Sequence, residues 1–100
     1  MNIKEVIISE YVYYELDSIF LFISKDSIKR AENILTTILL EAYSLYEFPK
    51  KGRVIPELNK ENYRELLIQN YRIMYKIKDE KIIISAVRHS SREFNFEDLK

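Results

Sequence analysis

The segment that decides the fold runs from Tyr63 to Phe94 and reads YRELLIQNYRIMYKIKDEKIIISAVRHSSREF. Two runs rich in Ile, Val and Tyr flank the polar tetrad Lys78–Lys81. This arrangement is typical of a β-hairpin, although the turn contains neither Gly nor Asn. The sequence therefore predicts two antiparallel strands joined by a two-residue loop of Asp79 and Glu80.

The length of this loop fixes the register that we expect in the hairpin. It pairs Ile77 with Ile82, Tyr75 with Ile84, Ile73 with Ala86 and Tyr71 with Arg88. Side chains alternate along a strand, so the four residues of the first strand share one nearly apolar face, which requires a covering layer of helices. The opposite face is mixed and carries Arg72, Met74 and Lys76.

The rest of the chain supplies that layer. Residues 28–46 are predicted to be helical, because apolar residues recur from Ala31 to Leu45 at helical spacing. Further predicted elements are a strand in residues 2–9, a helix from Tyr11 to Ile23, strands over 54–58 and 63–68, and a polar tail over 95–100. We expect Ser9 and either Asp26 or Ser27 to cap the helices with their side chains, Gly52 to adopt a positive φ, and Pro56 to place its strand at an edge.

These elements define the expected fold class. It is α+β with two layers, in which an N-terminal strand and an antiparallel helical hairpin pack on one face of a mainly antiparallel sheet. The 100 residues suggest one domain, residues 1–100.

Composition limits the possible functions. The absence of Cys rules out a disulfide framework and a thiolate metal site, and a single His makes a zinc site a poor hypothesis, so we expect no cofactor. Sixteen basic and sixteen acidic residues give zero net charge, which argues against a broad phosphate-binding surface. The N-terminus lacks the pattern of a signal peptide, and the longest apolar run, Ile19–Ile23, is too short to cross a membrane. These features favour a cytoplasmic protein with no membrane partner.

Two groups of residues are candidates for a site. The first predicted helix carries more aromatic residues than one buried stripe can hold: Tyr11, Tyr13, Tyr14, Phe20 and Phe22. Either this helix is buried on two sides, or some of these rings form an exposed partner-binding face. Polar residues also gather where the hairpin leaves the sheet: Arg72, Arg88, His89, Ser90, Ser91 and Arg92.

The same residues carry a family resemblance. Tyr71-Arg72-Ile73-Met74-Tyr75, a charged turn, an Ile-rich strand and Val87-Arg88-His89-Ser90-Ser91-Arg92 resemble the C-terminal half of the RelE/ParE toxins of type II toxin–antitoxin systems. The resemblance covers nearly the whole chain and is closer to the ParE-like branch. It extends through Glu15-Leu16, Ile19, Phe22-Ile23, Ser27, Ala31, Leu45, Pro49, Gly52-Arg53, Pro56-Glu57-Leu58 and Tyr63-Arg64.

The resemblance implies a toxin of a plasmid-stabilising module that inhibits DNA gyrase and is neutralised by an antitoxin. The antitoxin would bind the helical hairpin and the sheet, and Tyr11, Tyr13, Tyr14, Phe20 and Arg88 are the residues we expect to contact it. A non-toxic scaffold that only binds an antitoxin is a further alternative.

The other branch implies a ribosome-dependent mRNA endonuclease. Its catalytic residues here would be Arg64, Arg72, His89 and Arg92, with the arginines stabilising charge on the phosphate and His89 moving a proton. Two departures weaken this hypothesis, since Phe94 lacks the hydroxyl of the Tyr that many RelE relatives carry and Leu66 replaces a basic residue. Alternatively, Arg72 and Arg88 pair with Glu65 or with acidic residues of the tail, and His89 only forms hydrogen bonds at the end of its strand.

Overall fold

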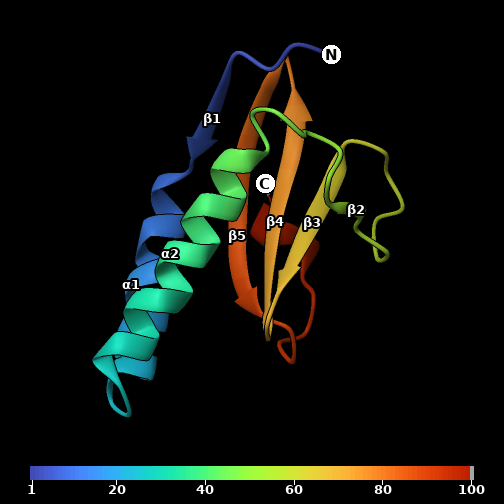
Figure 1. The fold of residues 1–100 in the computed structure, drawn as a ribbon. Helices are drawn as coiled ribbons and strands as arrows, with labels where there is room; N and C mark the ends of the chain where they lie inside the picture. Colours follow the sequence, from blue (N-terminus) through green and yellow to red (C-terminus); the bar gives the residue numbers. More distant parts are fainter. Residues whose placement is uncertain (100) are drawn as a thin grey trace.

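The computed structural model describes residues 1–99, without the side chains of residues 96 and 98 (Figure 1). Lys100, the last residue of the expected tail, lies outside the described residues. The elements are β1 (Glu5–Ile8), α1 (Glu10–Ser24), α2 (Ile28–Ser44), β2 (Arg53–Val54), β3 (Tyr63–Ile68), β4 (Tyr71–Lys78), β5 (Lys81–His89) and a 3₁₀ helix, η1 (Phe96–Leu99). The strands form one sheet in the order β1-β5-β4-β3-β2. β1 is parallel to β5 and the other neighbours are antiparallel, which confirms the expected fold class.

The two helices form an antiparallel hairpin against one face of the sheet, as Figure 1 shows. The sheet contributes Tyr71, Ile73, Tyr75 and Ile77 to the buried core, so the predicted apolar face of the hairpin is confirmed. α2 buries the stripe Ala31, Ile34, Ile38 and Ala42, while α1 buries only Val12, Leu16 and Ile23. α1 therefore presents most of its surface to solvent.

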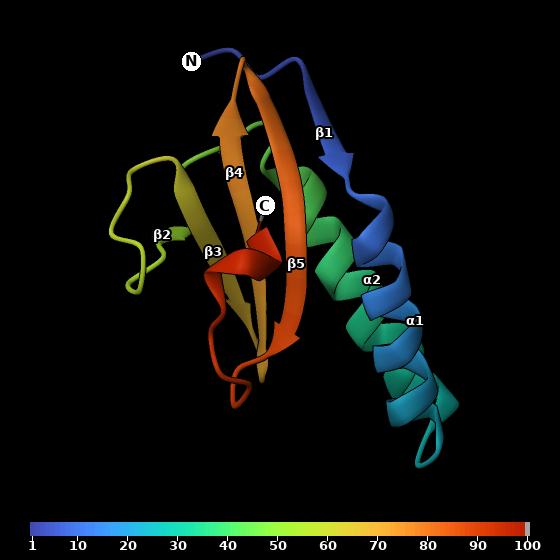
Figure 2. The same cartoon turned by 180° about the vertical axis from the view of Figure 1, so that it is seen from behind.

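The opposite face of the sheet carries a second, smaller core. Met74 and Ala86 are buried there against Ile55 and Leu99. Figure 2 shows that the C-terminal 3₁₀ helix lies across this face. The tail, in which the sequence shows no pattern, is ordered as a 3₁₀ helix because Leu99 covers apolar side chains of the sheet.

The hairpin has the expected loop but only half of the expected register. Asp79 and Glu80 adopt φ values of 53° and 61°, the left-handed conformation that a type I′ turn requires. Ile77 pairs with Ile82 and Tyr75 with Ile84, as predicted. Beyond the turn-proximal half the prediction is wrong, because a bulge shifts the register and pairs Ile73 with Val87 and Tyr71 with His89.

The bulge has one consequence for the site. The residue without a partner in the β4–β5 register is Ser85, and nothing in its sequence context signals an insertion. The shift places Arg72 directly opposite Arg88. Like charges in that position repel, so each guanidinium needs carboxylates of its own.

Of the two side-chain helix caps that the sequence predicts, the structure contains one. Ser27 caps α2, and its side-chain oxygen accepts a hydrogen bond from the backbone N–H of Arg30 at 3.1 Å. Ser9 occupies the N-cap position of α1, but its hydroxyl is buried and makes no hydrogen bond to the described residues. The side-chain cap expected at Ser9 is therefore wrong.

Gly52 does not adopt a positive φ, so that expectation is also wrong. Glycine is required there because of close packing: an added Cβ would lie 2.6 Å from the carbonyl oxygen of Glu65 and 2.7 Å from the hydroxyl oxygen of Tyr75. That hydroxyl accepts a hydrogen bond from the Gly52 N–H at 3.0 Å and donates one to the Pro49 carbonyl at 2.8 Å.

The edge strand β2 shares only Val54 with the strand predicted over residues 54–58. It ends at Val54, and residues 55–59 form a turn in which the N–H groups of Leu58 and Asn59 donate to the Ile55 carbonyl at 3.1 and 2.9 Å. Pro56 has no N–H to give to a strand ladder, which favours the turn. Glu57 lies on this turn, close to the sheet.

Candidate functional site

A groove of about 590 Å³ lies between α1 and the C-terminal half of β5. β1 pairs with β5 only from Lys81 to Ile84, and within residues 1–99 no other strand pairs along that edge. The last contact of this segment with β5 is the hydrogen bond from the Ser9 N–H to the Ile84 carbonyl at 3.2 Å, after which the chain enters α1. The groove is lined by Tyr11, Tyr14, Glu15, Ser18, Ile19, Phe22, Tyr71, Val87, Arg88, His89, Ser91 and Arg92.

Glu15 joins α1 to the unpaired edge of β5. One carboxylate oxygen accepts the backbone N–H of Val87 at 2.9 Å, and the other forms a salt bridge with Arg88. Arg88 is buried, and its guanidinium carbon lies 5.7 Å from the centre of the Tyr11 ring. The floor of the groove is therefore a fixed ion pair with an aromatic ring above it.

The rim of the groove is polar and basic at the end of β5. The ring of His89 stacks edge-on against Tyr71, with centroids 5.5 Å apart. Its Nδ1 accepts the backbone N–H of Ser91 at 3.1 Å, which places the proton of a neutral ring on Nε2. His89 and Arg92 are both exposed.

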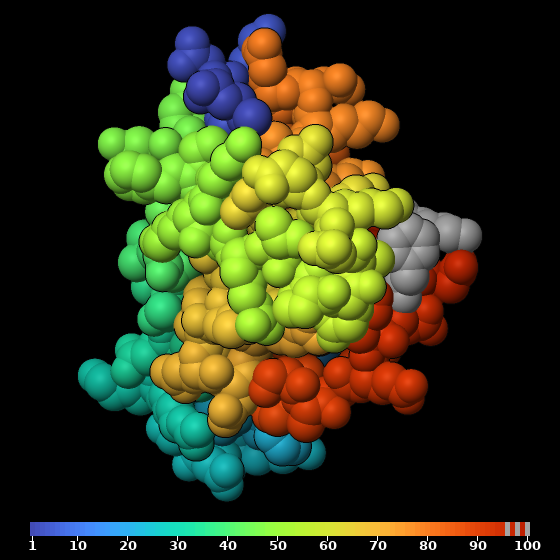
Figure 3. Space-filling view, turned by 90° about the vertical axis from the view of Figure 1, so that its right-hand side faces the viewer, coloured from blue at the N-terminus to red at the C-terminus, as the bar shows by residue number. Residues whose placement is uncertain are grey.

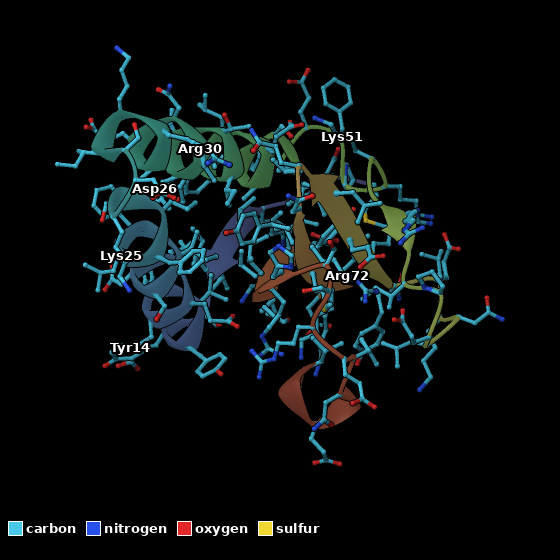
Figure 4. The ribbon with its side chains drawn as sticks, turned by 90° about the horizontal axis from the view of Figure 1, so that it is seen from below. Tyr14, Lys25, Asp26, Arg30, Lys51 and Arg72 are labelled. Carbon is cyan, nitrogen blue, oxygen red and sulfur yellow. The ribbon has the colours of Figure 1, made fainter. Side chains whose placement is uncertain are left out.

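The aromatic residues of α1 fall into three groups. Tyr11, Tyr14 and Phe22 line the groove, and the latter two are 64% and 69% exposed. Tyr13 is exposed but lies outside the groove, and Phe20 packs partly buried against the core. Figure 4 shows Tyr14 on the outer side of the molecule. Phe22 is among the rings from which the sequence predicts a partner-binding face, but not among the residues expected to contact the antitoxin, although its four-residue spacing from Ser18 and eight-residue spacing from Tyr14 put it on the same helix face.

Arg72 occupies a different site, near the centre of Figure 4. Its Nε donates to Glu65 at 2.6 Å, and its two terminal nitrogens donate to the two oxygens of Glu57 at 2.9 and 2.8 Å. Arg53 holds the second oxygen of Glu65 at 2.8 Å. The Phe94 ring lies below the guanidinium, 5.7 Å from its central carbon.

These contacts favour the charged forms of both Arg72 and Glu57. The hydrogen bond with Glu57 raises the pKa of Arg72 above its already high value, with the Glu65 hydrogen bond adding to this against the opposing effect of burial. The same hydrogen bond from Arg72 lowers the pKa of Glu57. Two guanidinium groups and two carboxylates therefore form a network that is neutral in total.

Arg64 is held in a third place. Its Nε and one terminal nitrogen bind the backbone carbonyl and the carboxylate of Glu61 at 3.0 and 2.6 Å. The other terminal nitrogen donates to the Gly52 carbonyl at 2.8 Å. Through this contact Arg64, which lies on β3, binds the loop that precedes β2.

The structure does not bring the four candidate catalytic residues together. His89 and Arg92 line the groove, whereas Arg72 lines a separate pocket of about 370 Å³ with Arg53, Glu57, Gln69 and Ser90. Among the candidates for partner binding, the groove unites Tyr11, Tyr14 and Arg88. The sequence offered Glu65 as a possible partner of Arg72 or Arg88, but it did not point to Glu57 or Glu15, which lie on a turn and on a helix outside the segment from Tyr63 to Phe94.

No helix within residues 1–99 is long and apolar enough to cross a membrane.

A comparison with curated proteins found no match.

Other comparisons place the chain in a family. A solved chain from a chromosomal ParDE toxin–antitoxin system of P. aeruginosa has the same fold, with a TM-score of 0.72 at 14% identity over 89% of this chain and 98% of that chain. The family model described as "ParE toxin of type II toxin-antitoxin system, parDE" matches residues 6–94. Because this match covers most of the chain, the chain belongs to the ParE toxin family of type II toxin–antitoxin systems.

Proposed function

We propose that this chain is the cytoplasmic toxin of a two-protein module, that it inhibits DNA gyrase, and that a cognate antitoxin neutralises it by filling the groove between α1 and β5. The observation that carries the antitoxin site is the groove itself, with Tyr14 and Phe22 largely exposed beside the buried Arg88. Aromatic residues around a fixed arginine are the composition typical of protein interfaces.

The chemistry of the groove indicates the kind of segment that fits. Tyr11, Tyr14 and Phe22 offer apolar surface along one turn after another of α1, which suits an amphipathic partner segment. The end near His89 and Arg92 is basic, which suits an acidic side chain. An antitoxin segment with apolar residues followed by a carboxylate satisfies both.

The arrangement of the arginines supports gyrase over mRNA as the target. An endonuclease must offer preorganised positive charge to the scissile phosphate, and losing one such group costs about 10² to 10³ in rate. Both ends of the Arg72 fork already bind Glu57, and Arg64 is bound to Glu61 and to backbone carbonyls. Phe94 lacks a hydroxyl and Leu66 lacks a charge.

Binding at the groove is tested with two tyrosines from adjacent positions of α1. We expect Tyr14→Ala to weaken binding of the antitoxin by about 2 kcal/mol, or about thirtyfold, because an aromatic anchor is lost. Tyr13→Ala is the matched control, since Tyr13 is equally a tyrosine on the surface of α1 but lies outside the groove. Equal losses in the two variants, measured by calorimetry, would show that the antitoxin does not use the groove.

The target is tested in cells that express the chain without its antitoxin. We expect growth arrest with gyrase-dependent DNA breaks and intact mRNA by primer extension, unchanged in His89→Ala. Codon-phased mRNA cuts that vanish in His89→Ala and Arg92→Ala would establish the endonuclease instead. Normal growth would identify a scaffold that only binds an antitoxin.

A further inference from the structure

We infer that the tip of the helical hairpin is the surface by which the chain binds its protein target, and that the target meets this tip with an apolar pocket rimmed by carboxylates. The tip comprises residues 21–30, which are the end of α1, the turn after it and the first turn of α2. The inference rests on the proposed function, because it takes DNA gyrase as the target.

Three large apolar side chains are exposed at the tip. Leu21, Phe22 and Ile28 are 65%, 69% and 63% exposed. The Ile23 carbonyl accepts the backbone N–H of Ser27 at 3.1 Å, which brings the start of α2 back to the end of α1. Figure 3 shows the teal atoms of the tip at the lower end of the molecule, below the orange-red residues that follow β5. Grouped apolar side chains that the fold leaves in solvent indicate an interaction surface.

Basic residues surround these apolar side chains. Lys25, Lys29 and Arg30 are exposed, and the tip contains one acidic residue, Asp26, so that its net charge is +2. Figure 4 shows Lys25 and Arg30 on the helical hairpin, away from Arg72. None of the three basic residues forms an ion pair within residues 1–99, whereas the arginines of β2, β3, β4 and β5 all do. The tip therefore keeps a positive charge in a chain whose net charge is zero.

The stability of α2 does not explain two of these charges. Lys29 and Arg30 lie in the first turn of the helix, and this turn contains no acidic residue. The N-terminal end of a helix carries a partial positive charge, so basic side chains there disfavour the helix. A role in binding accounts for residues whose position is unfavourable for folding.

The combination of charge and apolar surface indicates the occupant. Leu21 and Ile28 are buried only by an apolar pocket, and the surrounding cations are complementary to carboxylates at its rim. The phosphates of a nucleic acid match the cations but leave these two aliphatic side chains in water. The tip of a second copy of the chain carries the same charge and is repelled. An acidic protein surface satisfies both requirements.

The tip also overlaps the groove between α1 and β5. Phe22 lines that groove and belongs to the tip. An antitoxin that fills the groove therefore covers part of the surface that binds the target. Neutralisation follows from this overlap, because the two partners compete for Phe22.

The test of the charges titrates intact gyrase with the chain and measures DNA supercoiling. The double variant Lys29→Glu with Arg30→Glu should need at least about tenfold more protein for half-inhibition, and its inhibition should depend less on salt than that of the unchanged protein. Acidic residues in the first turn favour the helix, so unfolding would not explain this loss. Lys78→Glu is the control, since Lys78 is exposed and also forms no ion pair within residues 1–99, and it should inhibit normally.

The apolar part of the tip is tested with two aliphatic residues of α2. Ile28→Ser should raise the half-inhibiting concentration about tenfold, because an apolar contact with the target is lost. Leu40→Ser is the matched control, since Leu40 is 68% exposed on the same helix but lies outside the tip, and it should have no effect. Phe22→Ala should weaken binding of both gyrase and the antitoxin, whereas Ile28→Ser should leave antitoxin binding unchanged.

The possible outcomes separate this inference from the proposed function. If the unchanged protein inhibits gyrase and the tip variants inhibit it equally well, the inference is overturned and the proposed function stands. Equal losses in Lys78→Glu and the double variant reveal a general charge effect and also overturn the inference. A loss in the double variant with normal inhibition by Ile28→Ser assigns the tip to the DNA held by gyrase and excludes the apolar pocket. If the unchanged protein does not inhibit gyrase, the proposed function fails and the inference fails with it.

Discussion

Arg72 and Arg88 face each other across β4 and β5, and both are buried, with 7% and 6% of their surfaces exposed. They nevertheless belong to different sites. Arg88 is bound by Glu15 from α1 at the edge of the sheet, and Arg72 is bound by Glu65 from β3 and Glu57 from a surface turn. The adjacent strands β4 and β5 can carry these two like charges opposite each other because each arginine has its own carboxylates.

The difference lies in the origin of the carboxylates. Glu15 also accepts the Val87 N–H, so it connects a helix to the backbone of the sheet and stabilises the packing of the two layers. Glu57 reaches Arg72 from the surface turn of residues 55–59, and its side chain is 39% exposed. Two buried arginines of similar exposure are thus held by carboxylates from different kinds of segment, a helix for Arg88 and a strand with a surface turn for Arg72.

Removal of Glu15 should have the largest effect. Glu15→Ala leaves the buried Arg88 without this carboxylate and removes the acceptor of the Val87 N–H, which should cost about 3 kcal/mol of unfolding free energy. Denaturant unfolding measures the loss. Asp17→Ala, an exposed position on the same helix, is the control and should change stability by less than about 0.5 kcal/mol. Similar values for the two variants would contradict the structural role of Glu15.

Gly52→Ala should come second. The added methyl group overlaps the Glu65 carbonyl and the Tyr75 hydroxyl, and the adjustment should cost about 2 kcal/mol. Because Arg53 follows Gly52, the shift should perturb amide signals at Glu65 and Arg72 and leave those at Arg88 unchanged. Equal perturbation at both arginines would show that the two sites are coupled.

Glu57→Gln should have a much smaller effect on stability. Its contact with Arg72 is partly exposed and screened by solvent, so the expected cost is between about 0.2 and 1 kcal/mol. Thermal unfolding at low and high salt measures it, and the difference from the unchanged protein should shrink at high salt. A loss as large as that in Glu15→Ala would contradict the weak contribution expected from a partly exposed contact.

The smallest effect should be a dependence on pH. Arg72 lowers the pKa of Glu57 below its ordinary 4.5, so this carboxylate contributes stability above that pH. The contribution is lost as the pH falls from 4.5 through the lowered value, because the protonated group no longer binds Arg72 as an anion. Glu57→Gln should remove this part of the acid-induced loss, and a stability profile identical to that of the unchanged protein would contradict the assignment.

Much of the fold follows from local patterns. The strand from Tyr63 to Ile68 and the loop of Asp79 and Glu80 are where the sequence predicts them, because short apolar runs and turn geometry depend on neighbours in the chain. The fixed loop also sets the register next to it. Farther along the hairpin the prediction fails, because the extra residue Ser85 shifts the pairing by one and is not a glycine that would signal a bulge in the sequence.

The site was predicted less completely than the fold. The sequence identified tyrosines of α1 and the basic residues after β5, and the structure brings Tyr11, Tyr14, Arg88, His89 and Arg92 into one groove. It did not separate Tyr13 or Phe20 from them. Sequence spacing places residues on a helix, but which side faces a groove depends on where the helix packs.

By itself the sequence determined the order of the α-helices and strands, the family and the apolar face of the central hairpin, because these follow from periodicity and from motifs read along the chain. Only the tertiary structure decided how the charges are shared. Glu15 is 73 residues from Arg88 and Glu57 is 15 residues from Arg72, and each meets its arginine through the packing of separate elements. Electrostatic pairing acts over a few ångströms in space, so it is fixed only when the sheet, the helix and the turn have been assembled.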